Sequence, residues 1–156
     1  MAKDSGNGSK HLVIVESPAK ARTIGRYLGH GFDVAASVGH VRDLPKKELG
    51  VDVDRGFEPR YVTIRGKGKI LSELKRKAKD VDTVILATDP DREGEAIAYH
   101  VAEHLGLDKQ PDRFRRVQFR EITKAAVEHA LKSPGTLDMK KVEAQQARRV
   151  LDRLVG

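Results

Sequence analysis

Short apolar runs alternate with helix-forming segments along most of this chain, and this alternation limits the folds that it can adopt. The apolar runs have the length of strands and cover residues 11–15, 32–38, 61–65, 82–87 and 114–119. Helices are expected over about 18–28, 69–79, 91–105, 123–132 and 138–154. Strands that alternate with helices predict an α/β fold with a parallel sheet covered on both faces.

Three segments fall outside this alternation. Residues 1–10 are rich in Gly, Ser, Asp, Asn and Lys, and we expect a flexible tail there. Residues 39–60 mix Pro, Gly and charge without periodicity, which predicts a long ordered loop. The last helix has no stop signal before the final residue, so we expect a piece of a longer chain. Part of that helix would then pack against something not present here, through Val150, Leu151 and Leu154.

Composition narrows the possible partners and chemistry. The chain has 30 Lys and Arg residues against 23 Asp and Glu, a formal net charge of +7 that favours a polyanionic partner such as nucleic acid. It has no cysteine, which excludes disulfides, thiolate metal sites and thiol nucleophiles. No stretch approaches the roughly 18 apolar residues of a membrane helix, and no secretory signal opens the chain. We therefore expect a cytoplasmic protein without membrane contacts.

Acidic residues follow two of the predicted strands at the point where each strand ends. Glu16 follows the first strand, and Asp89 follows the fourth; Asp91, Glu93 and Glu95 come directly afterwards. Ligands of open parallel sheets bind outside the carboxyl ends of the strands. If these two strands are neighbours, Glu16 faces Asp89 and Asp91, and carboxylates that close repel one another unless a cation lies between them. A hard divalent ion with oxygen ligands, Mg²⁺, fits that need.

The helix that begins at Asp91 offers a second explanation for part of this cluster. Acids in the first turn of a helix are stabilised by the helix dipole, which accounts for Asp91 and Glu93. It does not account for Glu16, or for Asp89, which precedes the cap and is followed by a proline. On spacing alone, both explanations stay open.

A basic helix start lies next to Glu16. Ser17 is a suitable cap and Pro18 a suitable first residue for the helix. The free N–H groups of that turn and the charge of Lys20 would together bind an anion, so the acids and this turn predict a phosphodiester site. Alternatively, Lys20 is a solvated lysine. The basic segment 66–69 lacks the spacing of a Walker loop and is interpreted as a flexible loop.

Four sequence segments together resemble bacterial DNA topoisomerase I, the type IA class. They are VESPAKA at 15–21, SVGHVRDLP at 37–45, TDPDREGEAI at 88–97 and AQQARRVLDR at 144–153, and RVQFREITK at 116–124 resembles a fifth signature. The resemblance implies a Toprim domain, a Rossmann-like parallel sheet flanked by helices, over 11–137. It also implies that 138–156 is the truncated start of a following helical, DNA-binding domain. The implied activity is relaxation of negatively supercoiled DNA by cutting one strand, passing another and resealing.

The resemblance also implies roles for individual residues. Glu16 would be a metal ligand and a candidate general acid or base, and Lys20 would stabilise negative charge on the phosphate. Asp89, Asp91 and Glu93 would complete the set of Mg²⁺ ligands. Further matched positions would line the path of the single strand or its gate: His40, Arg116, Arg148, Arg149, Asp152 and Arg153.

These DNA-binding assignments have structural alternatives. His40, after Gly39, could brace its loop by a hydrogen bond. Arg148 and Asp152 stand four residues apart and could merely pair on a helix surface. The basic face of the last helix could also be simply solvated.

One departure from the family pattern concerns the nucleophile. The class uses a tyrosine followed closely by Arg and Thr, and the context of Tyr61 does not match, while Tyr27 and Tyr99 fall inside predicted helices. The covalent step would then belong to another part of the parent chain. We expect this chain to be a monomer, inactive alone, whose partners are a single-stranded segment of supercoiled DNA and the remaining parental domains.

Two other functions stay open at this point. The chain could belong to another Toprim phosphotransferase, a primase or nuclease, although the segment at 144–154 matches topoisomerases instead. It could also be a non-catalytic module that binds nucleic acid.

Overall fold

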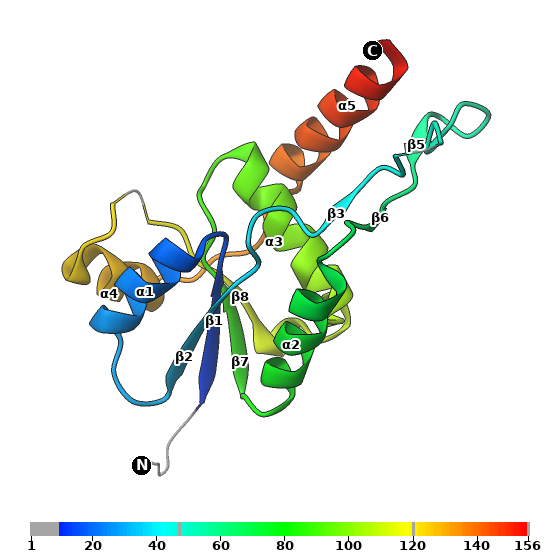
Figure 1. Ribbon diagram of the computed structural model, residues 1–156. Helices are drawn as coiled ribbons and strands as arrows, with labels where there is room; N and C mark the ends of the chain where they lie inside the picture. Colours follow the sequence, from blue (N-terminus) through cyan, green and yellow to red (C-terminus); the bar gives the residue numbers. More distant parts are fainter. Residues whose placement is uncertain (1–9, 47, 120, 156) are drawn as a thin grey trace.

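The computed structural model describes residues 10–46, 48–119 and 121–155 (Figure 1). A four-stranded parallel sheet forms its centre, in the order β2-β1-β7-β8. The strands are β1 (His11–Val15), β2 (Phe32–Ala36), β7 (Thr83–Leu86) and β8 (Phe114–Arg116). The predicted α/β class with a parallel sheet is confirmed, whereas the predicted tail lies outside the described residues except for Lys10.

Helices cover both faces of this sheet (Figure 1). One face carries α1 (Pro18–Tyr27) and α4 (Lys124–Lys132), and the other carries α2 (Gly68–Lys79) and α3 (Arg92–His104). Leu12 and Ile14 point to the α2 and α3 side, while Val13 and Val15 join the cluster on the other side. Because both faces are buried, these strands read as continuous apolar runs.

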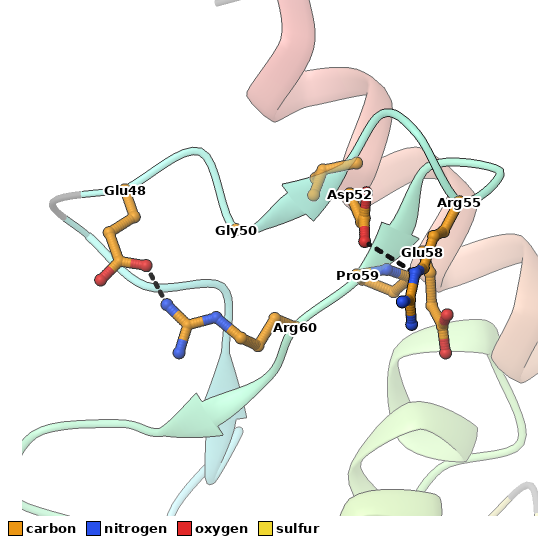
Figure 2. A pocket seen from close by; sticks show the side chains of 8 residues that line it. Glu48, Gly50, Asp52, Arg55, Glu58, Pro59 and Arg60 are labelled. Carbon is orange, nitrogen blue, oxygen red and sulfur yellow. Dashed lines mark hydrogen bonds and ion pairs between the residues drawn. The ribbon is translucent and has the colours of Figure 1, made fainter.

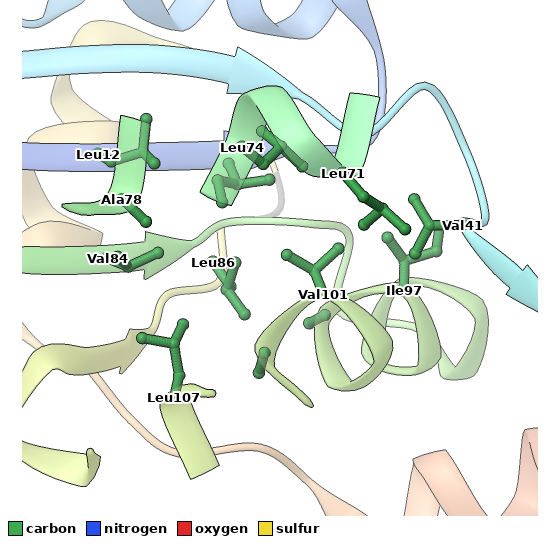
Figure 3. Close-up of a cluster of buried hydrophobic side chains, with 13 residues drawn as sticks. Leu12, Val41, Leu71, Leu74, Ala78, Val84, Leu86, Ile97, Val101 and Leu107 are labelled. Carbon is green, nitrogen blue, oxygen red and sulfur yellow. The ribbon is translucent and has the colours of Figure 1, made fainter. Parts of the chain in front are cut away.

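The larger buried cluster joins the sheet to α2 and α3 (Figure 3). Leu71 and Leu74 of α2 and Ile97 and Val101 of α3 pack over Leu86 of β7. Their spacing of three or four residues places them on the inner face of each helix. Two 3-10 turns, Leu107–Lys109 and Pro111–Arg113, then lead from α3 into β8.

The segment between β2 and α2 differs from the prediction. It contains two antiparallel ribbons outside the main sheet: β3 (Arg42–Asp43) pairs with β6 (Val62–Thr63), and β4 (Val51–Asp52) with β5 (Glu58–Pro59). The strand predicted at 61–65 therefore shrinks to two residues and does not join the parallel sheet. Its side chains are exposed or only half-buried, which does not suit a strand covered on both faces.

Helix α5 (Met139–Val155) packs along α3 and projects past the sheet (Figure 1). Val142 and Gln145 are buried, and Val150 forms a small cluster with Leu44 and Val51. Val150 therefore has partners within this chain, contrary to the prediction, whereas Leu151 and Leu154 are exposed. No helix in the described part of the chain is both long enough and apolar enough to cross a membrane.

Candidate functional site

The predicted acidic site lies where the strand order reverses, at the carboxyl ends of β1 and β7. These two strands are neighbours, which was the condition on which the site was predicted. The backbone amide of Asp89 donates to Oε2 of Glu16 at 2.7 Å. Glu16 and Asp89 therefore face one another at the switch point, where open parallel sheets bind ligands.

Lys20 lies between these two carboxylates. Its Nζ is 2.9 Å from Oε1 of Glu16 and 3.0 Å from Oδ1 of Asp89. Ser17 caps α1 by accepting from the Lys20 amide at 3.2 Å, which fixes the backbone from which the side chain starts. Lys20 is only 8% exposed, and its ammonium stands 5.2 Å from the centre of the Phe119 ring. It is therefore a buried cation paired with two acids, and not the solvated lysine that the sequence left open.

The other acids of the predicted cluster have partners of their own. Asp91 is the N-cap of α3, and its Oδ1 accepts from the Gly94 amide at 2.7 Å. Oε2 of Glu93 lies 3.1 Å from Nε2 of His40. Among the residues that the structure describes, no three His, Asp or Glu side chains converge closely enough to hold a metal ion. The helix-start explanation thus describes Asp91 well in this arrangement.

The residues at the switch point suit Mg²⁺ in chemistry but not in position. Oε1 of Glu16 is buried with the Lys20 ammonium as its partner, and Asp89 offers a carboxylate that is 58% exposed, so hard oxygen donors are present. Mg²⁺ requires oxygens at about 2.0–2.1 Å. The space between these two oxygens is taken by the ammonium of Lys20. As arranged here, the pair of acids fits an ammonium group, and a divalent ion would fit only after Lys20 moved away.

His40 reaches its position through a turn that wraps the end of β1. Gly39 adopts a φ of 81°, which glycine tolerates, and its amide donates to the Glu16 carbonyl at 2.8 Å. The turn directs His40 toward the first turn of α3, where it meets Glu93. This contact connects the loop to the edge of the acidic site.

Close packing behind Asp89 depends on Gly94 of α3. A Cβ at this position would stand 2.0 Å from the carbonyl oxygen of Asp89. The hydroxyl of Thr88 also donates to the Gly94 carbonyl at 2.6 Å. The first turn of α3 therefore rests directly on the backbone that carries Asp89. No pattern in the sequence predicts this role of Gly94, because the close approach joins two separate turns of the backbone.

Arg116 does not line a DNA path in this structure, contrary to the prediction from the family resemblance. It is 1% exposed, and its Nε and one terminal nitrogen donate to Oε1 of Glu95 at 2.9 and 2.6 Å. Glu95 is fully buried as well. The guanidinium also donates to backbone carbonyls at the strand ends, those of Leu86, Thr88, Asp89 and Val117. Arg116 therefore holds the backbone beneath the acidic site.

Two of the arginines expected to bind DNA are engaged within the chain. Arg149 donates to both carboxylate oxygens of Asp43, at 2.7 and 2.9 Å. Although burial opposes ionisation, the hydrogen bonds from Arg149 and the Leu44 amide keep the pKa of Asp43 below its ordinary value. Arg153 donates to three backbone carbonyls of the loop after β3, those of Pro45, Glu48 and Leu49. Phosphate binding at Arg149 would require an exchange of partners.

Arg148 and Asp152 face solvent on the outer side of α5. No hydrogen bond or ion pair joins them in the described part of the chain, so the structure does not show the surface pair that their spacing allowed. Both side chains are open to a partner.

Hollows of different character surround these residues. An open cleft of about 1,030 Å³ adjoins Asp89 and Asp91, and its lining also includes Phe119, His129 and Lys141. A second hollow of about 420 Å³ lies at the β4–β5 ribbon (Figure 2). Its charged side chains pair among themselves, Glu48 with Arg60 and Asp52 with Arg55, and do not converge on a common point. Of these two hollows, the first borders the acidic site.

A smaller polar cavity of about 190 Å³ lies between α3, α5 and the β3–β6 ribbon. Buried atoms without a hydrogen-bond partner line it: the hydroxyl of Tyr61, Nδ1 of His100 and Oε1 of Gln145. Burial, aided by the nearby charge of Arg42, lowers the pKa of His100 to about 4. Burial also raises the pKa of Tyr61 to about 12, so both groups are neutral at neutral pH.

Comparisons with known proteins agree with the fold described above. The sequence model of the Toprim domain matches residues 11–122. The structure of full-length topoisomerase I from Thermotoga maritima is similar to this chain, with a TM-score of 0.85 and 48% sequence identity. That similarity covers 93% of this chain and 24% of the Thermotoga chain. The chain therefore spans about a quarter of the length of the topoisomerase that it matches.

Proposed function

The chain belongs to the Toprim domain family, and on that premise we propose that it is the Toprim part of a type IA DNA topoisomerase. The parent would relax negatively supercoiled DNA by transient cleavage of one strand, strand passage and Mg²⁺-dependent resealing. The similarity to the Thermotoga topoisomerase over 93% of this chain supports the assignment. Because its substrate is DNA, the protein would act in the cytoplasm at the nucleoid. We also propose that it is a monomer whose chain contains further domains.

One observation carries the proposal: Lys20 and Glu16 adjoin one another at the switch point, beside the cleft next to Asp89. A phosphodiester entering there meets the ammonium of Lys20 in the first turn of α1. The ammonium stabilises negative charge on phosphate oxygens as the phosphorus gains its fifth ligand.

Glu16 is proposed to donate a proton to the 3′ oxygen in cleavage and to accept it back in resealing. In the parent, a tyrosine of another domain loses its hydroxyl proton to solvent and attacks phosphorus, the bond to the 3′ oxygen breaks, and a 5′-phosphotyrosyl bond forms. The leaving 3′ oxygen needs a proton, and the buried Oε1 of Glu16 could carry one once the Lys20 ammonium, 2.9 Å away here, has moved aside. Resealing reverses the transfer, with Glu16 as the base.

Glu16, Asp89 and Asp91 would hold the metal once Lys20 has left the space between the first two. When bound, Mg²⁺ would supply positive charge that helps to hold the 3′ end and its phosphate. Glu93 would adjoin this set, and His40, Arg148, Arg149, Asp152 and Arg153 would guide the strand. Arg116 is omitted because its guanidinium is enclosed.

A chimera tests the proposal. This chain replaces the corresponding quarter of the Thermotoga topoisomerase, and plasmid relaxation and covalent adducts are measured. We expect the chimera to relax DNA, and Glu16→Gln and Lys20→Ala to slow relaxation by about 100-fold. The exposed Lys75→Gln serves as a control and should retain activity.

Two results would contradict the proposal. One is a folded chimera that binds DNA but forms no adduct. The other is metal-dependent nicking of DNA by the present chain alone, which would favour another Toprim phosphotransferase, because no tyrosine here has the sequence context of the nucleophile.

A further inference from the structure

We propose that Lys20 is a built-in cation of the acidic site, and that its ammonium and a divalent metal ion exclude one another from Glu16 and Asp89. The inference rests on the proposed function, which supplies the metal. It goes further by giving Lys20 control over when that metal binds.

The geometry leaves room for only one of the two cations. The ammonium of Lys20 stands 2.9 and 3.0 Å from the two carboxylate oxygens that face one another. A divalent ion held by these two oxygens must come to within about 2.1 Å of both, in the space that the ammonium fills. An ammonium and a divalent ion that both lay beside these oxygens would also repel one another strongly in a partly buried site.

Lys20 is held there more firmly than a surface lysine. Its side chain is 8% exposed, its backbone is fixed by the Ser17 cap, and the Phe119 ring lies beside the ammonium. Glu16 is fixed in turn by the Asp89 amide. The two acids are thus already neutralised in part without any metal, and a metal that enters must first displace Lys20.

A substrate phosphate offers the Lys20 ammonium another partner. The Asp89 side of the pair is open, so the ammonium can turn outward to a phosphate oxygen at the adjoining cleft. That movement frees the oxygens of Glu16 and Asp89 for the metal. Phosphate and metal should therefore bind cooperatively, and by linkage each raises the affinity for the other.

Two simpler roles for Lys20 predict different behaviour. If Lys20 only contacts phosphate, its removal leaves metal affinity unchanged. If Lys20 orients the carboxylates for the metal, its removal weakens metal binding. Only competition makes the metal bind more tightly when the ammonium is removed.

The test is a titration with Mn²⁺, followed by electron paramagnetic resonance, on the present chain and on Lys20→Gln, Lys20→Arg and Lys75→Gln. Lys75 is exposed on α2, so Lys75→Gln matches the charge change away from the site. We expect Lys20→Gln to bind Mn²⁺ at least about tenfold more tightly than the unsubstituted chain. The Mn²⁺ affinities of Lys75→Gln and Lys20→Arg should be close to that of the unsubstituted chain. Circular dichroism confirms that each variant is folded, and Glu16→Gln added to Lys20→Gln should abolish the gain.

Equal or weaker Mn²⁺ binding by Lys20→Gln would overturn the proposal while leaving the metal site itself intact. Absence of Mn²⁺ binding in every folded variant would overturn both this proposal and the metal part of the proposed function. A second titration includes a single-stranded oligonucleotide at low salt. The oligonucleotide should tighten Mn²⁺ binding to the unsubstituted chain but not to Lys20→Gln. An equal effect on both would contradict the proposed coupling between phosphate and metal binding.

Discussion

Arg116 and Glu95 form an ion pair that is closed off from solvent beneath the acidic site. Arg116 donates to Oε1 of Glu95 at 2.9 and 2.6 Å, and the other carboxylate oxygen accepts from the Asp138 amide at 3.0 Å. The pair therefore joins β8 and α3 to the residue that precedes α5. Arg116 also donates to backbone carbonyls near the ends of β7 and β8, and Gln118 donates to Oε1 of Glu95.

Removing one member of this pair should be strongly destabilising. Arg116→Met and Glu95→Gln each leave buried polar groups without their partner, so we expect losses of about 3–5 kcal/mol in the free energy of unfolding. Urea denaturation followed by circular dichroism measures the loss. The double variant Glu95→Gln, Arg116→Met should lose less than the sum of the two single losses, because no charge is left unpaired. Single variants as stable as the parent would show that the pair is not structurally important.

Gly94→Ala should destabilise the protein although alanine favours helices. The added Cβ would stand 2.0 Å from the Asp89 carbonyl oxygen, a backbone atom that cannot turn aside. Overpacking of this kind costs about 1–3 kcal/mol, more than the helix propensity of about 1 kcal/mol returns. Thermal unfolding measures the change.

Gly25 in α1 offers the matched control. A Cβ there would meet only Val34 Cγ2, at 4.0 Å, so Gly25→Ala should raise the melting temperature. If Gly94→Ala is stabilising to the same degree, the close approach to Asp89 does not constrain the backbone.

The sequence predicted features that depend on a single helix or strand. It did not predict contacts between side chains that lie far apart along the chain. The apolar runs predicted the sheet, and the acids after β1 and β7 could be placed together once those strands were taken as neighbours. The position of Lys20 could not be predicted, because a lysine four residues after Glu16 can equally turn to solvent. Its burial depends on Asp89, which is 69 residues away.

Arg116 shows the same limit. It stands 21 residues after Glu95, and no periodicity joins an acid in the first turn of a helix to an arginine at a strand end. The family resemblance supplied a DNA-binding role instead, which its burial contradicts. The short β3–β6 ribbon escaped prediction because two-residue strands leave no alternation in the sequence.

Asp43→Asn should increase the affinity for single-stranded DNA. In the present structure Asp43 occupies Arg149 with two hydrogen bonds, and its lowered pKa keeps it ionised at neutral pH. The amide would hold Arg149 less strongly and leave it free for a phosphate. We expect severalfold tighter binding by fluorescence anisotropy, and a salt dependence steeper by about 0.7, the value of one further phosphate contact.

The control for that experiment is Asp112→Asn, which removes the same charge at an exposed position in the second 3-10 turn. It should change affinity much less. Arg149→Ala should weaken binding in either background. Equal effects of Asp43→Asn and Asp112→Asn would mean that net charge alone explains the gain.

His100 should make the protein less stable as the pH falls from about 6.5 to about 4. Burial, with Arg42 nearby, lowers its pKa in the folded state from 6.5 to about 4, so over this range the unfolded chain binds a proton that the folded chain does not. More protons on the unfolded state mean that stability rises with pH, by an amount on the order of 3 kcal/mol across the window. His100→Phe keeps an aromatic ring between Tyr61 and Tyr99 and removes the titration. The urea midpoints at pH 7, 5.5 and 4.5 should therefore differ less in this variant than in the unsubstituted chain. His30→Asn, at an exposed turn, should leave the pH dependence of the unsubstituted chain unchanged. A parent and a His100→Phe variant that lose stability in parallel would show that other groups, such as Asp43 and Glu103, carry the acid sensitivity.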